Sequence, residues 1–468
     1  MQPRVSITTR YIVGLVLIAA AGATALGVIA TSTLDKRDRE YFAGRVWCES
    51  SFDALSAACG AGLMMGDLSE YSAEARWVLF GTGMAGALLH VLTLAAVIRR
   101  IIGLPAPTRT ADAVEGEDAP PAASSIDAGP DPSARAADPA AAPSFTDGPS
   151  LGFIALSFLF VLSLLTLLVF AAARAACPTV TFAETAQLVG LAFISLGCVP
   201  EPVDPGTAMM LAVVGWVGAL GWPVWLGIIP RKRRGFGLPV PALRFALVYT
   251  VGLVLAGGLL TLLERPRGGE AVGVLRADVS SDPSLAAQPL GPRFGRSLVQ
   301  SVSAAACGIP TESIRDRGLR DSSKALLAGL AIFGGTGFGA AGGLGLLSFW
   351  IAFFGRSERT RRLGLLGIVL LTAVCLVTVI GLLSIESLIA SRYQPTPSFA
   401  DALLDASSAV GGGNLSSGLT ASLTNRSLVS GIGLGISQFI PGMILLALAL
   451  LAGRIIPVAV FDRMGRTA

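Results

Sequence analysis

The sequence contains a single histidine and few charged residues: Asp, Glu, Lys and Arg make up 14% of its 468 residues, whereas 53% are hydrophobic. Soluble domains carry about 25% charged residues, so this composition excludes an ordinary soluble protein and indicates a polytopic membrane protein. The HExxH, GxSxG and phosphate-loop motifs are also absent. An enzyme within a membrane needs clustered polar groups at membrane depth, where such groups are costly and therefore visible. We expect no enzyme.

Acidic residues are absent from the long hydrophobic runs, which argues against a proton-coupled carrier with a carboxylate relay. Crossing about 30 Å of hydrocarbon takes about 20 residues of helix. The uncharged runs of this length are 11–32, 77–98, 151–173, 207–229, 245–263, 325–354, 363–385 and 427–453. Because the first run is longer than the hydrophobic region of a signal peptide, we expect it to be retained as a helix.

Lys and Arg gather in the loops that follow the even-numbered runs, for example at Arg99 and Arg100 and in RKRR at 231–234. The positive-inside rule places these loops and both termini in the cytoplasm of a plasma (inner) membrane protein. One of these loops, residues 104–150, is rich in Pro, Ala, Ser and Asp and almost lacks large apolar residues. This composition predicts a disordered cytoplasmic linker.

The cysteines show no metal-ligand spacing, and we expect no bound metal beyond a transported ion. Most of them fall in segments expected on the outside, where an outer disulfide and small apolar packing residues are both compatible with the sequence: Cys48, Cys59, Cys177, Cys198 and Cys307. His90 lies in the second run, where a hydrogen-bonded packing role is favoured over a titrating one.

Two eleven-residue segments near opposite ends of the chain, SAACGAGLMMG (56–66) and SAVGGGNLSSG (408–418), share Ser, Ala, Gly, Leu and Gly in one register. Similar segments follow the first, third, fifth and seventh runs, and each consists of a short half-helix and a Gly-rich turn. Each opens near an aromatic residue: Trp47, Phe182, Phe294 and Phe399. The pattern predicts four repeats of span, half-helix, turn and span, at 1–103, 151–235, 236–358 and 359–468.

Non-helical backbone at membrane depth is tolerated where it is buried in protein or lines a water-filled path. Backbone carbonyls from four such turns can replace the hydration shell of a monovalent cation, and the half-helices direct their negative ends at it. We therefore expect an all-α fold in which eight transmembrane helices and four re-entrant half-helices surround a central cation pore. Helix packing by small residues is the alternative. The expected filter residues are Gly60, Ala61, Gly62, Leu196, Gly197, Ala306, Cys307, Gly308, Gly412, Gly413 and Asn414.

Four stretches of the chain resemble the Trk/Ktr and plant high-affinity potassium transporter superfamily. They are FDALSAACGAGLMMGDLSEYS, GALGWPVWLGIIP (218–230), SLVQSVSAAACGIPTESI with GGTGFGAAGGLG (334–345), and ADALLDASSAVGGGNLSSGLT with LLAGRIIP (450–457). The resemblance covers nearly the whole chain apart from 104–150. It implies a pore subunit in the lipid bilayer with potassium or sodium as substrate, no covalently bound cofactor and no nucleic acid partner. It also implies a homodimer. A separate cytosolic nucleotide-binding ring is expected to regulate it, because the chain has no soluble domain with a GxGxxG motif.

In that family a Gly-rich break in the sixth span gates the pore, and an Arg of the last span lies near it. The resemblance assigns this gate to Gly334, Gly335, Thr336, Gly337, Gly339, Gly342, Gly343 and Arg454. From the residues alone, the long Gly-rich run predicts a break, while a kinked packing helix and an interfacial anchoring role for the Arg are the alternatives.

The chain departs from the family at Asn414, where the fourth filter usually has Gly, so selectivity and conduction stay open. The alternative function is a non-conducting or sodium-permeable Trk-like membrane subunit or scaffold. Acidic residues flank the four turns and either concentrate cations at the mouth or are plain solvated loop charges: Glu49, Asp53, Asp67, Glu184, Glu201, Asp204, Asp401 and Asp405.

Overall fold

The fold was analysed in a computed structural model of the chain, and its regular elements are helices throughout the described residues. The structure describes residues 6–33, 36–65, 71–101, 150–197, 205–228, 240–264, 285, 288–309, 314, 319–340, 345–355, 357–389, 397–413, 415–419 and 440–466. The linker 104–150 lies almost wholly outside these ranges, as does Asn414.

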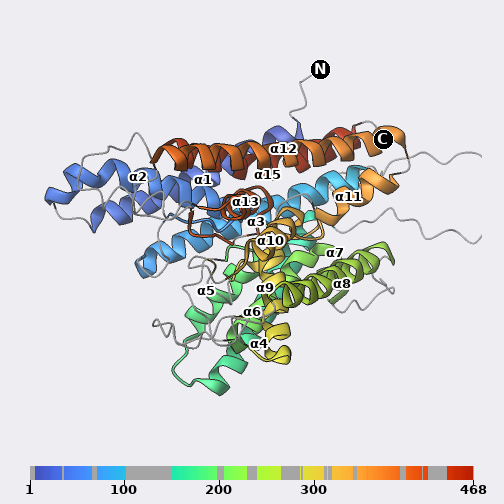
Figure 1. The fold of residues 1–468 in the computed structure, drawn as a ribbon, viewed down its shortest axis with the longest axis horizontal. Helices are drawn as coiled ribbons and strands as arrows, with labels where there is room; N and C mark the ends of the chain where they lie inside the picture. Colours follow the sequence, from blue (N-terminus) through green and yellow to red (C-terminus); the bar gives the residue numbers. More distant parts are fainter. Residues whose placement is uncertain are drawn as a thin grey trace, which may run out of the picture.

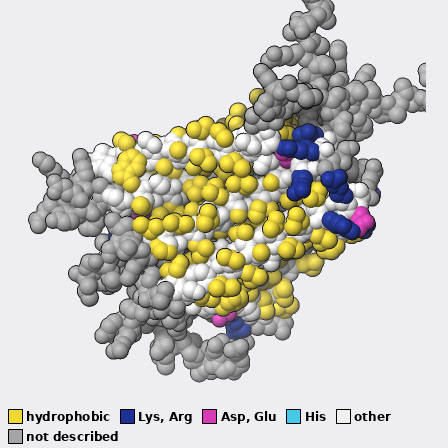
Figure 2. All heavy atoms as spheres, turned by 90° about the horizontal axis from the view of Figure 1, so that it is seen from above, with side chains coloured by type: hydrophobic (Ala, Val, Ile, Leu, Met, Phe, Trp, Pro, Cys, Tyr) yellow, Lys and Arg dark blue, Asp and Glu magenta, His cyan; other side chains and the backbone are white. Residues whose placement is uncertain are grey.

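Within this part of the chain, 6 helices are long and apolar enough to cross a membrane. They match the first, second, third, fifth, seventh and eighth expected spans: α1 (Ile7–Ser32), α3 (Ala73–Ile101), α4 (Leu151–Ala176), α8 (Val240–Leu263), α12 (Glu358–Ile389) and α15 (Ile440–Gly465). α12 and α15 run side by side along one long edge of the molecule (Figure 1). Figure 2 shows hydrophobic side chains over most of the visible face, as contact with lipid requires, and Lys and Arg gathered at the end where α15 terminates.

Asp462 brings three helix ends to one side of the molecule. Its carboxylate accepts a hydrogen bond from Thr8 at the start of α1 (3.1 Å) and from Arg100 at the end of α3 (3.5 Å), while Asp462 itself lies near the end of α15. The start of α1 therefore shares a side with the loop after the second span and with the C-terminal tail, as the charge pattern predicts. That this side is the cytoplasm stays a prediction.

The other two expected spans are broken. The fourth divides into α6 (Pro205–Leu220) and α7 (Trp222–Ile228) at Gly221, whose φ is 81°. The sixth consists of α10 (Asp321–Phe333) and α11 (Gly345–Phe354), and the described residues between them, 334–340, are non-helical. The predicted break in the sixth span is confirmed, whereas the expectation of one continuous fourth span over 207–229 is wrong. Gly221, with its left-handed backbone, ends α6. The carbonyls at the end of α6 accept hydrogen bonds from the break in the sixth span.

A half-helix precedes each of four turns: α2 (Lys36–Ala58), α5 (Phe182–Phe193), α9 (Leu290–Val302) with a π-helical turn (Ser303–Cys307), and α13 (Phe399–Gly411). Phe182 and Phe399 open their helices as predicted, because Thr181 and Ser398 form capping boxes directly before them. α2 and α9 start earlier than Trp47 and Phe294. The aromatic residue thus marks the helix start only where a capping box precedes it; α9 begins after Pro289 without a side-chain cap.

Glycines let the half-helices pack closely on the spans that follow them. In three cases a Cβ on a span glycine would lie 2.0 Å from a carbonyl oxygen at the end of the half-helix: Gly86 against Ala58, Gly218 against Phe193, and Gly453 against Val410. Any larger residue would push the half-helix away, since real side chains do not approach backbone so closely. The same contact thus recurs in three of the four repeats.

Candidate functional site

The C-terminal ends of the four half-helices meet in chain order, the first beside the second and so on. Three contacts join neighbours: a Cβ on Gly60 would lie 3.2 Å from Ile194 O, the Ser195 hydroxyl donates to Ala306 O, and a Cβ on Gly413 would lie 2.5 Å from Ala304 O. The arrangement brings together the residues predicted for the filter in all four turns. Asn414 alone among them lies outside the described residues.

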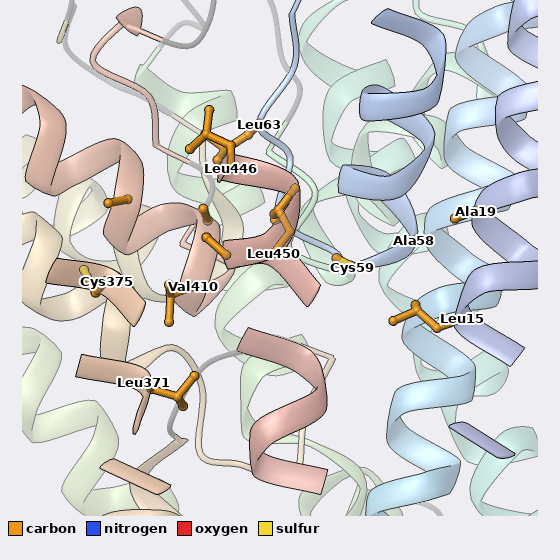
Figure 3. Close-up of a cluster of buried hydrophobic side chains, with 14 of the residues drawn as sticks. Leu15, Ala19, Ala58, Cys59, Leu63, Leu371, Cys375, Val410, Leu446 and Leu450 are labelled. Carbon is orange, nitrogen blue, oxygen red and sulfur yellow. The ribbon is translucent and has the colours of Figure 1, made fainter. Parts of the chain in front are cut away.

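One hydrophobic cluster contains residues of the first turn, of α13 and of α15. Cys59 and Leu63 of the first turn are buried in the same cluster as Val410 of α13 and Leu450 of α15. Figure 3 shows the first turn passing between α1, which contributes Leu15, and α13 and α15. The turns are consequently held by apolar packing as well as by backbone contacts.

Left-handed backbone occurs in every one of these turns. The positive φ values are those of Gly60 (57°), Gly62 (56°), Ser195 (60°), Gly197 (55°), Gly308 (67°) and Gly412 (69°). Glycine adopts this region freely, which accounts for the glycines predicted at these positions. Ser195 is the only non-glycine residue with positive φ in the described part of the chain, and its hydrogen bond to Ala306 O stabilises it there. This role of Ser195 was not predicted, because serine rarely adopts a left-handed conformation.

The broken fourth and sixth spans are docked onto each other by the backbone groups that their breaks expose. Thr336 donates through its N–H (3.2 Å) and its hydroxyl (3.0 Å) to Ala219 O, and the hydroxyl also reaches Leu220 O (3.0 Å). Ala340 N–H donates to Gly218 O (3.3 Å). Carbonyls left over at the end of α6 are thereby satisfied at membrane depth, where each unpaired group is costly.

The break in the sixth span contains the residues predicted as a gate. Gly334, Gly335, Thr336 and Ala340 are buried, whereas Gly337 is partly exposed. Gly339 packs so tightly that a Cβ would lie 2.5 Å from Gly218 O. Gly342 and Gly343 lie outside the described residues. The break is therefore a bonded loop and not a kinked continuous helix.

We expect alanine at Gly221 to disrupt this docking. Its Cβ would lie 2.2 Å from the carbonyl carbon of Phe338, and the positive φ adds strain. Together these should destabilise the fold by about 2–4 kcal/mol and lower the melting temperature of the purified protein. Gly329→Ala in α10 is the matched control, since no atom lies within 4 Å of its Cβ. Equal melting temperatures for the two variants would refute the interlocked geometry.

Arg454, on α15, connects the first turn to the break in the sixth span. Its side chain is 3% exposed. It donates from Nε to Cys59 O, from Nη1 to Ala340 O (3.2 Å) and from Nη2 to Gly60 O (3.4 Å). The interpretation of Arg454 as an interfacial anchor is wrong, because three buried backbone carbonyls hold its guanidinium inside the protein.

The acidic residues near the turns differ widely in environment. Asp53 and Asp405 are fully buried, so they are not solvated charges at a mouth. Asp401 forms an ion pair with Lys324 of α10 at 2.6 Å. Partial burial raises the pKa of Asp401, but hydrogen bonds from Lys324 and Ser398 outweigh it, and the pKa lies below its usual value. Asp67, Glu201 and Asp204 lie outside the described residues.

His90 and three of the cysteines, Cys59, Cys307 and Cys375, are buried in the described part of the chain. The Tyr11 hydroxyl and His90 Nδ1 form a buried hydrogen bond of 3.0 Å between α1 and α3, which confirms the predicted hydrogen-bonded histidine. Cys48, Cys59, Cys177, Cys307 and Cys375 are free thiols. Cys59 and Cys307 are buried within the turns, as expected of small apolar residues, while Cys198 lies outside the described residues.

Comparison with solved structures identifies the fold. The crystal structure of the potassium transporter TrkH from Vibrio parahaemolyticus aligns with a TM-score of 0.60 at 12% sequence identity, over 97% of this chain and 84% of that chain. No protein-family model matches the sequence, and no curated protein matches it. The chain thus shares the Trk-type fold of this structure and is a multi-pass helical membrane protein.

Proposed function

We propose that this chain, with its Trk-type fold, is a pore-forming subunit that carries monovalent cations, potassium foremost, across the plasma membrane. The observation that carries the proposal is the meeting of four half-helix ends and their glycine-rich turns around one centre. Carbonyls of these turns would coordinate a dehydrated cation, and the negative ends of the half-helices would offset the cost of dehydration.

The break in the sixth span, 334–343, is proposed as the gate. Its described part, 334–340, is non-helical and is bonded to the break in the fourth span, and Arg454 joins it to the first turn. A movement of the break would therefore act on the filter through one side chain. We further propose a homodimer with cytoplasmic termini, regulated by a cytosolic nucleotide-binding ring.

A specific pair of observations favours a second candidate, a Trk-like subunit that conducts sodium or does not conduct. The sequence places Asn414 in the fourth filter, and Ser195 donates to the Ala306 carbonyl, which a bound ion would otherwise use. Either feature reduces the number of equivalent carbonyl ligands at one level of the filter.

Growth of a potassium-uptake-deficient bacterium in limiting potassium separates the two functions. We expect growth with the wild-type chain and with Asn414→Gly. Growth with Asn414→Gly alone would favour the second candidate, with the fourth filter as the altered part. If neither chain supports growth above an empty vector, potassium uptake by this chain alone is contradicted.

A further inference from the structure

Two buried carboxylates hold the chain just beyond the first and fourth turns. Asp53 of α2 and Asp405 of α13 are each 0% exposed. Asp53 Oδ1 accepts the N–H of Met65 at 2.9 Å, and Asp405 Oδ1 accepts the N–H of Ser417 at 2.6 Å. In both cases the donor lies 12 residues after the carboxylate. The same bond thus forms at the same place in two distant parts of the chain.

The second oxygen of each carboxylate is also bonded. Asp53 Oδ2 accepts from the Tyr71 hydroxyl, and Asp405 Oδ2 accepts from the Ser416 hydroxyl at 3.1 Å. A carboxylate without exposure to water is costly unless such bonds compensate it. Each Asp is therefore fixed behind its turn, and the N–H group that it binds is fixed with it.

This anchoring determines where the neighbouring carbonyls point. In a trans peptide the N–H and the C=O point in opposite directions, so the carbonyls of Met64 and Ser416 face away from the carboxylates. A second bond agrees with this in the fourth segment, where the Ser408 hydroxyl donates to Leu415 O at 2.6 Å. The carbonyl of Leu415 thus faces the half-helix, whereas the carbonyl of Ser416 lies on the opposite side of its peptide from the N–H that Asp405 binds, and faces away from the half-helix.

The other two half-helices lack such an anchor. Asp53 lies nine residues before Gly62. The residues nine positions before Gly197 and Gly308 are Leu188 and Val299, both apolar. Within the described residues, only the first and fourth turns have a buried aspartate behind their backbone. Charge-assisted hydrogen bonds are stronger than neutral ones, and the field of a charge extends further inside a protein than in water.

We propose that Asp53 and Asp405 are positioning residues for an outer, asymmetric cation site formed by the Met64 and Ser416 carbonyls, between the first and fourth turns. The inference rests on the proposed function and adds to it the residues that set cation affinity. Each half-helix enters from one side of the membrane, and the chain returns to the same side after its turn. The proposed site lies toward that side. It takes a monovalent cation with part of its hydration shell removed.

The test uses the purified full-length protein in detergent, with potassium chloride titrated against N-methylglucamine chloride, and reads the melting temperature. We expect potassium to stabilise the wild type. Asp53→Ala and Asp405→Ala should each raise the half-stabilising potassium concentration by about tenfold. The Asn variants should show a smaller shift, of about threefold, because an amide oxygen still accepts the N–H bond. Glu358→Gln is the matched control: it removes an exposed acid at the start of α12 that pairs with Arg362.

Rubidium uptake in cells distinguishes failure of this inference from failure of the proposed function. If the wild type takes up rubidium but the Asp variants keep its potassium dependence, the inference is overturned and the function stands. If the wild type takes up no rubidium but its stabilisation by potassium weakens in the Asp variants, the site stands without transport. Absence of potassium-specific stabilisation in the wild type overturns the inference. Should the Ala variants fail to fold, the same comparison is made with the Asn variants.

Discussion

Valine in place of Gly308 should reduce rubidium uptake at least about a hundredfold while leaving the protein folded. Gly308 follows the π-helical turn of the third half-helix with a φ of 67°. A β-branched residue does not adopt this region without strain, so the peptide should rotate and turn its carbonyl out of the ring. Losing one of the coordinating carbonyls removes part of the substitute for the hydration shell of the ion.

The matched control for this prediction is Gly252→Val. Gly252 lies in α8, is exposed, and has no atom within 4 Å of a Cβ. Uptake by this variant should equal that of the wild type. If Gly308→Val and Gly252→Val transport equally well at equal amounts of folded protein, the third turn has no part in the ion path.

Neutralising Arg454 should raise uptake and reduce the preference for potassium over sodium. The guanidinium is a buried positive charge against the first turn and bonds the break in the sixth span through Ala340 O. At a separation of about 8 Å and an effective dielectric constant of about 20, repulsion of a permeating cation amounts to about 2 kcal/mol. Arg454→Gln should therefore raise the rate by about tenfold or more.

Arg454→Lys separates the charge from the geometry. An ammonium group keeps the repulsion, but it cannot reach all three carbonyls in the fixed arrangement of a guanidinium. We expect a rate near that of the wild type with weaker ion discrimination. Uptake that falls equally in the Gln and Lys variants would contradict an electrostatic barrier and would favour a purely structural role for Arg454.

The membrane spans and the break in the sixth span were predictable because hydrophobic runs and dense glycine are local signals. The break at Gly221 was not, since a single glycine in a hydrophobic run usually serves helix packing. That break depends on partners far along the chain. The Thr336 hydroxyl donates to Ala219 O, and Phe338 O accepts the N–H of Trp222. Likewise, the early start of α2 at Lys36 follows from helix formation in a polar segment that lacks a hydrophobic pattern.

The filter glycines were predictable from a repeated frame, but the residues that support them were not. Asp53 and Asp405 were interpreted as mouth charges, since burial depends on tertiary contacts with Met65 and Ser417. The sequence does contain a signal: each Asp lies three residues before the serine with which its eleven-residue segment begins, Ser56 or Ser408. Extending the frame toward the N-terminus would have revealed the pair.

The central claim is that the four turns form a cation path, and flux through the purified protein tests it most directly. The protein would be reconstituted in liposomes loaded with potassium chloride, and uptake of radioactive rubidium would be followed with wild type, Gly308→Val and Gly252→Val. We expect rubidium to accumulate with wild type and Gly252→Val and not with Gly308→Val. Accumulation no greater than in protein-free liposomes for all three would contradict the claim that this chain conducts.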